Sequence, residues 1–208
     1  MNKVLITGGC GFIGFHMINK LIKKNNIILN LDFLGYASSK KDLNYKKNYR
    51  FINVDIKNFA KLKKIIFEFS PNYILNFAAE SHVDNSIVNA NPFINSNIIG
   101  TFNLLQIAKN LPNTFKMFVH ISTDEVFGSL SLNQKKKFSE KTPYDPSSPY
   151  SASKAASDHL VKAWGRTYNV PYIITNCSNN FGPRQFHEKL IPVIILSCIN
   201  KRFIPVYG

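Results

Sequence analysis

Tyr150 and Lys154 are the first pair of residues in this sequence whose types and spacing could do chemistry. They stand four residues apart in a segment expected to be helical, so both side chains should lie on one face of the helix. Tyrosine is a weak base at its ordinary pKa of about 10. A neighbouring ammonium group favours the phenolate and lowers that pKa. The spacing therefore predicts a proton-accepting tyrosine supported by a lysine.

A second reactive group is Ser122-Thr123-Asp124-Glu125, which follows the apolar run 117–121. If that run is a strand of a parallel sheet, these residues lie at its carboxyl edge, where such sheets bind ligands. Two adjacent carboxyl groups can serve as acid and base when their environments differ. The alternative interpretation is a turn and helix-capping cluster.

The glycine-rich segment Thr7–Gly14 predicts an anion site. It can be interpreted with glycines at Gly8, Gly11 and Gly14, or with Gly9 in place of Gly8. The segment follows a short apolar strand and begins a helix, which is the context that gives this motif meaning. The helix start at Phe12 and Ile13 offers N–H groups and the positive end of the helix dipole to a pyrophosphate.

Asp32 stands at the end of the second expected strand, where a carboxylate accepts hydrogen bonds from an adenosine ribose. A negative charge there repels a 2′-phosphate, so the position favours NAD over NADP. Asp55 and Ile56 end the third strand in a similar way, where an adenine amino group can be met.

Strands that alternate with helices must position these residues. We expect strands at 4–6, 27–31, 51–54, 73–77, 117–121, 172–175 and 204–206, and helices at 12–24, 59–69, 92–110, 151–168 and 191–200. The strands are continuous apolar runs, typical of a sheet covered by helices on both faces. The predicted fold is α/β, a doubly wound parallel sheet of the Rossmann type. We place an NAD-binding domain at 1–180 and the beginning of a substrate-binding domain at 181–208.

Composition restricts the class of protein further. The chain has 208 residues, 45% of them hydrophobic. It has no apolar run long enough to span a membrane, and we identify no signal-peptide pattern at its N-terminus. We therefore expect a cytoplasmic protein with no membrane partner. Its three cysteines form no CxxC pair and its five histidines are scattered, so neither a disulfide framework nor a metal site is expected. The net charge of +14 permits nucleic-acid binding, but the lysines are spread thinly, so we expect no nucleic-acid partner.

Several longer motifs resemble one known family. They are Ala78-Ala79-Glu80-Ser81-His82-Val83-Asp84, Ser148-Pro149-Tyr150-Ser151-Ala152-Ser153-Lys154, Thr175-Asn176-Cys177-Ser178-Asn179-Asn180 and Glu188-Lys189-Leu190-Ile191-Pro192, besides those above. Together they resemble the extended short-chain dehydrogenases/reductases, and among them the dTDP-glucose 4,6-dehydratases. The resemblance runs from residue 1 to residue 208.

The resemblance implies an activity and a cofactor. Tyr150 takes the proton of the sugar 4-OH while hydride leaves C4 for NAD, and Thr123 helps to hold the 4-oxygen. Glu125 then removes the C5 proton and Asp124 protonates the departing 6-OH, after which NADH returns hydride to C6. Lys154 holds the nicotinamide ribose. The product is a 4-keto-6-deoxy sugar, and dTDP-glucose is the favoured substrate.

The resemblance also implies contacts. Those to NAD fall to Gly8, Gly11, Phe12, Ile13, Gly14, Asp32, Phe33, Leu34, Gly35, Asp55, Ile56, Phe77, Ala78, Ala79, Glu80, Ser81, Ser96, Tyr150, Lys154 and Asn180. Those to the substrate fall to Ser81, Thr123, Asn179, Lys189, Leu190, Pro205, Val206 and Tyr207. Members of the family commonly form homodimers through the helices expected at 92–110 and 151–168. His82, His120 and His159 have no catalytic role in this scheme and are interpreted as packing or surface groups.

Departures from the family pattern leave alternatives open. The family continues for well over a hundred residues beyond Gly208, which predicts that this chain is C-terminally truncated. A first alternative is therefore an NAD-binding module with weak or no turnover. A second is an epimerase or another nucleotide-sugar dehydratase on the same scaffold, although the Asp124-Glu125 pair argues against an epimerase. Phe33 and Gly35 replace the lysine and threonine usual in the family, which bears on individual NAD contacts.

Overall fold

The computed structural model describes residues 1–43, 47–131 and 137–204. The chain divides into two compact units, Met1–Ser178 and Asn179–Gly208. The sequence analysis placed the boundary between an NAD-binding and a substrate-binding domain after residue 180, and this division into functional domains stays a prediction.

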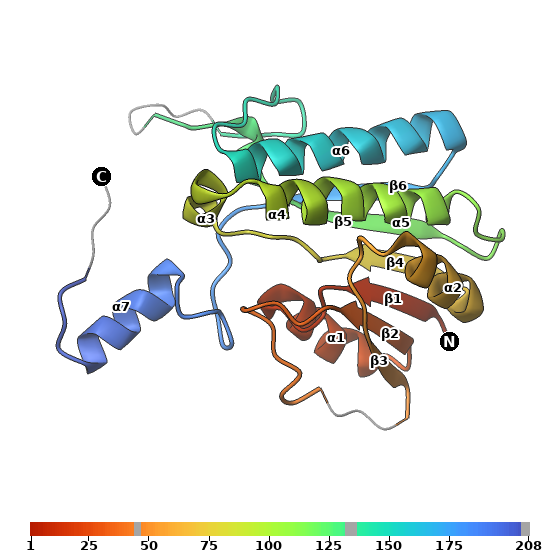
Figure 1. Cartoon of the computed structure of the whole chain (residues 1–208), viewed down its shortest axis with the longest axis horizontal. Helices are drawn as coiled ribbons and strands as arrows, with labels where there is room; N and C mark the ends of the chain where they lie inside the picture. The colour runs from red at the N-terminus through yellow and green to blue at the C-terminus, as the bar shows by residue number, and fades with distance from the viewer. Residues whose placement is uncertain (44–46, 132–136, 205–208) are drawn as a thin grey trace. The chain divides into compact units, whose positions relative to one another are not determined.

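The first unit is built on a six-stranded sheet with the order β3-β2-β1-β4-β5-β6 (Figure 1). All neighbouring strands pair in parallel. This order changes direction between β1 and β4, which is the switch point where doubly wound sheets bind ligands. The predicted Rossmann-type fold is confirmed. The strands are β1 Lys3–Thr7, β2 Ile27–Asp32, β3 Tyr49–Asn53, β4 Tyr73–Asn76, β5 Met117–Thr123 and β6 Tyr172–Cys177.

Helices cover both faces of this sheet because alternate strand residues point to opposite sides. On one face Leu5 of β1 packs in a core with α2 (Phe59–Phe69), α5 (Gly100–Ala108) and α6 (Pro149–Tyr168). On the other face Val4 and Ile6 pack with α1 (Phe12–Ile22). The strands are therefore buried on both sides, as their apolar runs predict.

The segment expected as one helix at 92–110 contains three pieces. It runs through α4 (Asn91–Phe93), a π-helical stretch η1 (Ile94–Ile99) and α5. A short helix α3 (Val83–Val88) precedes it and was not predicted, because six residues carry too little periodicity. The His82 side chain caps α3 by accepting a hydrogen bond from the Asn85 amide.

The start of α6 is fixed by local sequence. Ser148 accepts from the Ser151 amide, and the Ser151 hydroxyl accepts from the Ser148 amide, which forms a capping box. Pro149 occupies the first turn, where its missing N–H costs nothing. Tyr150 and Lys154 are thereby held in the first two turns of α6.

The second unit contains helix α7 (Leu190–Ile199). None of its residues is buried, although its sequence is almost wholly apolar. Of the strand expected at 204–206, Ile204 has no strand conformation, and the other two residues lie outside the described part of the chain.

Candidate active site

The glycine loop joins β1 to α1 at the carboxyl edge of the sheet. Gly8 has a φ of +69°, and a Cβ there would lie 2.6 Å from the Ala78 backbone nitrogen. A Cβ at Gly14 would lie 2.5 Å from the Gly8 oxygen. Both positions therefore exclude side chains. Helix α1 begins after Gly11 without a side-chain cap, so no side chain competes with an anion for its first amides.

Asp32 lies at the end of β2, beside this loop. Its Oδ2 accepts from the Cys10 amide at 2.9 Å and its Oδ1 accepts from the Leu34 amide at 2.8 Å. Asp32 is 5% exposed, so these bonds hold an almost buried carboxylate in a fixed orientation. Leu34 adopts a positive φ of 61°, which turns the chain away after Asp32.

The acidic pair follows β5 directly, in the 3₁₀ turn η2 (Asp124–Phe127). The buried Thr123 hydroxyl accepts from the Glu125 amide at 3.3 Å and contacts Asp124 Oδ1 at 3.4 Å. Val126 and Phe127 are buried behind the turn. Thr123 therefore does cap this turn, and the same geometry leaves both carboxyl groups partly exposed at the carboxyl edge.

Tyr150 faces this acidic turn from α6. Burial raises the pKa of its phenol, and the charge of Glu125 raises it further, while a hydrogen bond with the Thr123 side chain acts in the opposite direction. Asp124 contributes a smaller effect of the same sign as Glu125. Lys154 is not among the groups that shift this pKa. The expectation of a lowered phenol pKa next to Lys154 is thus wrong for this structure, because burial and the charge of Glu125 raise that pKa and Lys154 does not act on it.

Lys154 is 3% exposed and lies one turn further along α6. Its Nζ donates to the Ile121 carbonyl oxygen at 2.7 Å, so it contacts the backbone of β5. Burial lowers the pKa of Lys154 to about 8, while the charge of Asp158 acts to raise it. Because this pKa lies close to neutral pH, Lys154 can be either protonated or neutral there.

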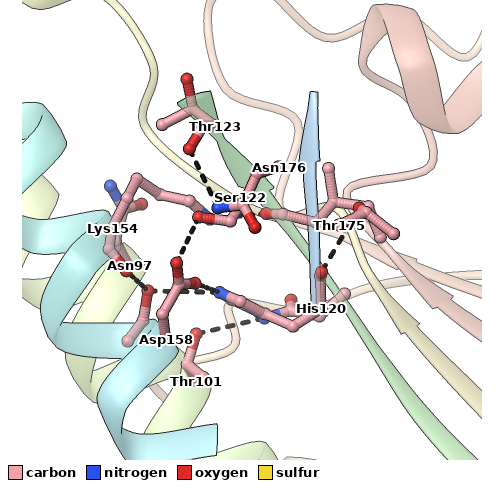
Figure 2. Close-up of polar contacts among 12 residues, drawn as sticks. Asn97, Thr101, His120, Ser122, Thr123, Lys154, Asp158, Thr175 and Asn176 are labelled. Atoms are coloured by element: carbon pink, nitrogen blue, oxygen red, sulfur yellow. Dashed lines mark hydrogen bonds and ion pairs between the residues drawn. The ribbon is translucent and has the colours of Figure 1, made fainter. Parts of the chain in front are cut away.

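Behind Lys154 lies a buried polar network that sequence reasoning missed (Figure 2). Asp158 accepts from the Ser122 hydroxyl at 2.8 Å and from Tyr144 at 3.0 Å, and it lies 3.4 Å from His120 Nε2. His120 is 1% exposed, so its interpretation as a packing group fits its burial. The missed signal is the spacing of Lys154 and Asp158, which are four residues apart on the buried face of α6.

Asn97 in the π-helical stretch connects the loop after β4 to α6. Its Oδ1 accepts from the Glu80 amide at 2.9 Å, and its Nδ2 donates to the Glu80 carbonyl at 3.0 Å and to Ser153 Oγ at 2.8 Å. A π-helical turn shifts the register of the helix and often marks a functional site. The loop predicted to contact NAD, 77–81, is therefore fixed to the helix that carries Tyr150.

Phe33, Asp55 and Ile56, further predicted NAD contacts, follow the carboxyl ends of β2 and β3. Phe33 is 48% exposed. Ile56 is buried, and its side chain fills the space that a Cβ at Gly100 would need. Asp55 lies 3.2 Å from Lys57 Nζ and accepts from the Lys57 amide. Ser96 is half-buried in η1, next to Asn97.

Other predicted contacts fall in the second unit. Asn179 and Asn180 are exposed, and Asn180 accepts through its carbonyl oxygen from Gln185 at 2.9 Å. Lys189 precedes α7 as its N-cap, and Leu190 is its first residue. Pro205, Val206 and Tyr207 lie outside the described residues. The roles of all these positions stay predictions.

Across 1–43, 47–131 and 137–204, no group of three or more histidine, cysteine, aspartate or glutamate residues could hold a metal ion. In the same part of the chain, no helix is both long enough and apolar enough to cross a membrane.

Comparison with known proteins agrees with this arrangement. The sequence profile of the GDP-mannose 4,6 dehydratase family matches residues 5–208, and the chain belongs to that family. A probable dTDP-glucose 4,6-dehydratase of Sinorhizobium fredii is 47% identical over 216 residues, which cover 99% of this chain and 61% of the relative. The resemblance seen in the motifs is thus confirmed.

Solved structures show the same fold. The dTDP-glucose 4,6-dehydratase of Streptomyces venezuelae with NAD and TYD bound is 38% identical, with a TM-score of 0.92 over 99% of this chain and 65% of that one. A UDP-glucuronic acid 4-epimerase of Bacillus cereus with UDP-glucuronic acid and NAD is 27% identical, with a TM-score of 0.90 over 99% and 66%. The chain spans about three fifths of the length of the curated relatives it matches.

Proposed function

We propose that this chain carries the NAD site and the acid–base residues of a dTDP-glucose 4,6-dehydratase, a lyase that forms dTDP-4-keto-6-deoxyglucose. The observation that carries the proposal is the η2 turn. It places the adjacent Asp124 and Glu125 beside the Thr123 hydroxyl, with the charge of Glu125 acting on Tyr150. An elimination of water needs one acid and one base side by side, and this turn supplies both.

The residues at the switch point fit NAD. The side-chain-free Gly8 and Gly14 let the backbone approach a pyrophosphate, and no side chain competes with it for the first amides of α1. The Asp32 carboxylate keeps further acceptor sites for ribose hydroxyls beyond its two backbone bonds. Lys154 and Tyr150 would hold the nicotinamide ribose. Support also comes from the two structural neighbours named above, both of which contain NAD.

The first half of the reaction falls to α6 and β5. When bound, NAD supplies the hydride acceptor for oxidation at C4 and the hydride donor for reduction at C6. Tyr150 would accept the proton of the 4-OH, and the Thr123 hydroxyl would hold the 4-oxygen. Because the pKa of Tyr150 is raised, its phenol is neutral near pH 7 and first meets the substrate as a hydrogen-bond donor. Tyr150 can accept the 4-OH proton only after it has released its own proton to solvent, and a nearby cation would favour that release.

The second half falls to the η2 turn. A ketone at C4 acidifies the C5 proton, and the Glu125 carboxylate would remove it. The Asp124 carboxyl group would give a proton to the departing 6-OH, and water leaves. After C6 is reduced, the protonated Glu125 would return a proton to C5, which completes the 4-keto-6-deoxy product. Since the two residues are neighbours on one turn, they act from one side of the sugar, which suits a syn elimination.

The remaining assignments complete the proposal. Besides residues already placed, NAD contacts are proposed for the segments 33–35, 55–56 and 77–81 and for Ser96 and Asn180. Substrate contacts are proposed for Ser81, Asn179, Lys189, Leu190, Pro205, Val206 and Tyr207. The thymidine nucleotide is supported by the names of the curated relatives.

The test is a direct assay of the purified chain. Incubation with NAD and dTDP-glucose should give a 4-keto-6-deoxy product, detected by its absorbance in alkali. Glu125→Gln should abolish the product. The matched control is Glu140→Gln, which makes the same change at an exposed glutamate and should keep the product. NAD binding is measured separately by calorimetry for all three proteins.

Each outcome distinguishes one function. Product that depends on Glu125 supports the dehydratase. NAD binding without product would refute turnover by this chain and favour a dinucleotide-binding module. A 4-epimer formed without loss of water would favour the epimerase, which the similar fold of the Bacillus cereus enzyme makes the second candidate.

We also propose a cytoplasmic homodimer, with neither a nucleic-acid nor a membrane partner. Support for the dimer comes from the segment 92–110, where Ile94 and Ile99 are 43% and 42% exposed. Support for the cytoplasm comes from the cysteine pattern, which gives no disulfide framework. Light scattering after gel filtration tests the dimer, and Ile99→Glu should give a monomer.

A further inference from the structure

Asp158 is a fully buried carboxylate that the proposed reaction does not use. It is 0% exposed and follows Lys154 by four residues, so both side chains lie on the face of α6 that packs against β5. Figure 2 shows Asp158 between Ser122 and His120, with Lys154 reaching along the same side of the helix. A buried charge is stable only when it is paired or hydrogen-bonded.

Within the described residues, Asp158 accepts hydrogen bonds through Oδ2, whereas its buried Oδ1 has no hydrogen-bond partner. Its Oδ2 accepts from the hydroxyls of Ser122, at 2.8 Å, and Tyr144, at 3.0 Å. Two donors on one oxygen are compatible with the ionised form that the counter-ion role requires. Burial raises the pKa of Asp158, while the charge of Lys154 and both hydroxyls act to lower it.

His120 does not supply the missing positive charge. Burial, and then the charge of Lys154, lower the pKa of its imidazole well below the ordinary value. The Asn76 amide donates toward Nδ1 at 3.2 Å, which leaves the proton on Nε2, facing Ser157 Oγ at 3.2 Å and Asp158 Oδ1 at 3.4 Å. The imidazole of His120 is therefore neutral and lies beside Asp158 without contributing a positive charge.

The other charged or titratable groups that face this pair are few. Lys162, one turn beyond Asp158 on α6, lies 3.2 Å from the Tyr144 hydroxyl and acts on Asp158 from the solvent side. Cys177 of β6 acts on Lys154, and its thiol donates to the Ser122 carbonyl at 3.3 Å. Of the groups that act on Asp158, Lys154 is the strongest cation.

We propose that Asp158 is a positioning residue that serves as the buried counter-ion of Lys154 and, through the Ser122 hydroxyl, holds the end of β5 against α6. Lys154 itself donates to the carbonyl of Ile121, the residue before Ser122. Asp158 thereby fixes both the charge of Lys154 and the strand end that leads into Thr123, Asp124 and Glu125. Both side chains lie on one buried face of α6 and are bonded to the adjacent residues Ile121 and Ser122 of β5, which supports an interaction between the two charges. The effect of this interaction on cofactor binding rests on the proposed function.

The experiment measures the proton affinity of Lys154 in the whole chain. The ¹³Cε resonances of labelled lysines are titrated, and the Lys154 resonance is assigned by its loss in Lys154→Met. Asp158→Asn keeps the shape and the acceptor oxygen but removes the charge. It should lower the pKa of Lys154 by about one unit, a tenfold loss of proton affinity. Asp84→Asn, an exposed aspartate in the first turn of α3, should leave it unchanged.

A titration of Lys154 that is the same in Asp158→Asn and in the unchanged chain would overturn the proposal. Tyr144→Phe removes one hydroxyl but keeps the carboxylate, so it should shift Lys154 much less than Asp158→Asn does. If Asp158→Asn does not fold, the ¹³Cγ titration of Asp158 in the unchanged chain decides. An ionised carboxylate at pH 7 supports the pairing, and a protonated one refutes it.

A second measurement links the pair to the cofactor. The dissociation constant of NAD is followed against pH by calorimetry, without any sugar present. It should rise as Lys154 loses its proton, and in Asp158→Asn this rise should move to lower pH by about one unit. Failure of the chain to bind NAD at any pH would refute the proposed function, while the lysine titration would still test the ion pair.

Discussion

Gly8→Ala is the substitution whose effect on folding follows most directly from the structure. Gly8 has a φ of +69°, and a left-handed conformation costs an L-residue about 1–2 kcal/mol. The added Cβ would also lie 2.6 Å from the Ala78 nitrogen and 2.7 Å from its Cα, both backbone atoms. Overpacking of this kind costs about 1–3 kcal/mol.

The two effects together should destabilise the chain by about 3 kcal/mol. The loop has little freedom to escape, because the Gly8 amide donates to the Leu31 carbonyl at 2.9 Å. For a domain of this size, such a loss lowers the melting temperature by roughly 6–12 °C. The assay is thermal and urea unfolding of the purified chain, followed by circular dichroism.

Gly11→Ala is the matched control in the same loop. Its Cβ would meet only the Gly8 oxygen, at 3.3 Å, and Gly11 has a negative φ of −77°. It should cost less than about 1 kcal/mol. Equal losses for Gly8→Ala and Gly11→Ala would refute the argument from backbone conformation and close approach.

Three further predictions concern the site. Tyr150→Phe should lower product formation by about 10²–10⁴-fold, the usual contribution of a positioned acid or base, with less than a threefold change in NAD affinity by calorimetry. Equal losses in both would mean that the phenol serves binding instead. Asp32→Asn should weaken NAD binding by about tenfold and narrow the preference over NADP, since the negative charge that repels a 2′-phosphate is gone. An unchanged preference would contradict that role. Because the folded-state pKa of Lys154 is lowered to about 8, the unfolded chain binds more protons between pH 8 and 10.5, so the free energy of unfolding should rise across that window by about 3 kcal/mol. The check is denaturation of Lys154→Met at several pH values, because its free energy of unfolding should not show this rise.

Local sequence patterns predicted most of the fold. The helix expected at 59–69 has those bounds in the structure, because Asn58 caps its start and Ser70, in a left-handed conformation, ends it. The strands β1, β2, β5 and β6 were predicted one or two residues short, since polar residues such as Asp32 and Thr123 end them. The strand predicted at 73–77 was one residue too long, and the one predicted at 51–54 lies at Tyr49–Asn53. The π-helical stretch was not predicted, because six residues carry too little periodicity to distinguish a π-helix from an α-helix.

The positions of the site residues were more predictable from the sequence than their protonation states. The strand-end rule places Thr123, Asp124 and Glu125 correctly at the carboxyl edge. The protonation of Tyr150 was not accessible in this way, because it depends on burial and on the direction of Glu125, which only the fold determines. Asp158 was missed for the same reason, since its partners Ser122 and Tyr144 are remote in sequence.

The side chain of Asn97 has a consequence for how the protein responds to ligands. One amide group is bonded at once to both backbone atoms of Glu80 and to Ser153 on α6. A displacement of the 77–81 loop by a ligand must therefore either move α6 as well or break buried hydrogen bonds. Occupancy of the loop and the alignment of the proton-transfer side chains are thus thermodynamically linked, and each should influence the affinity of the other by the same factor.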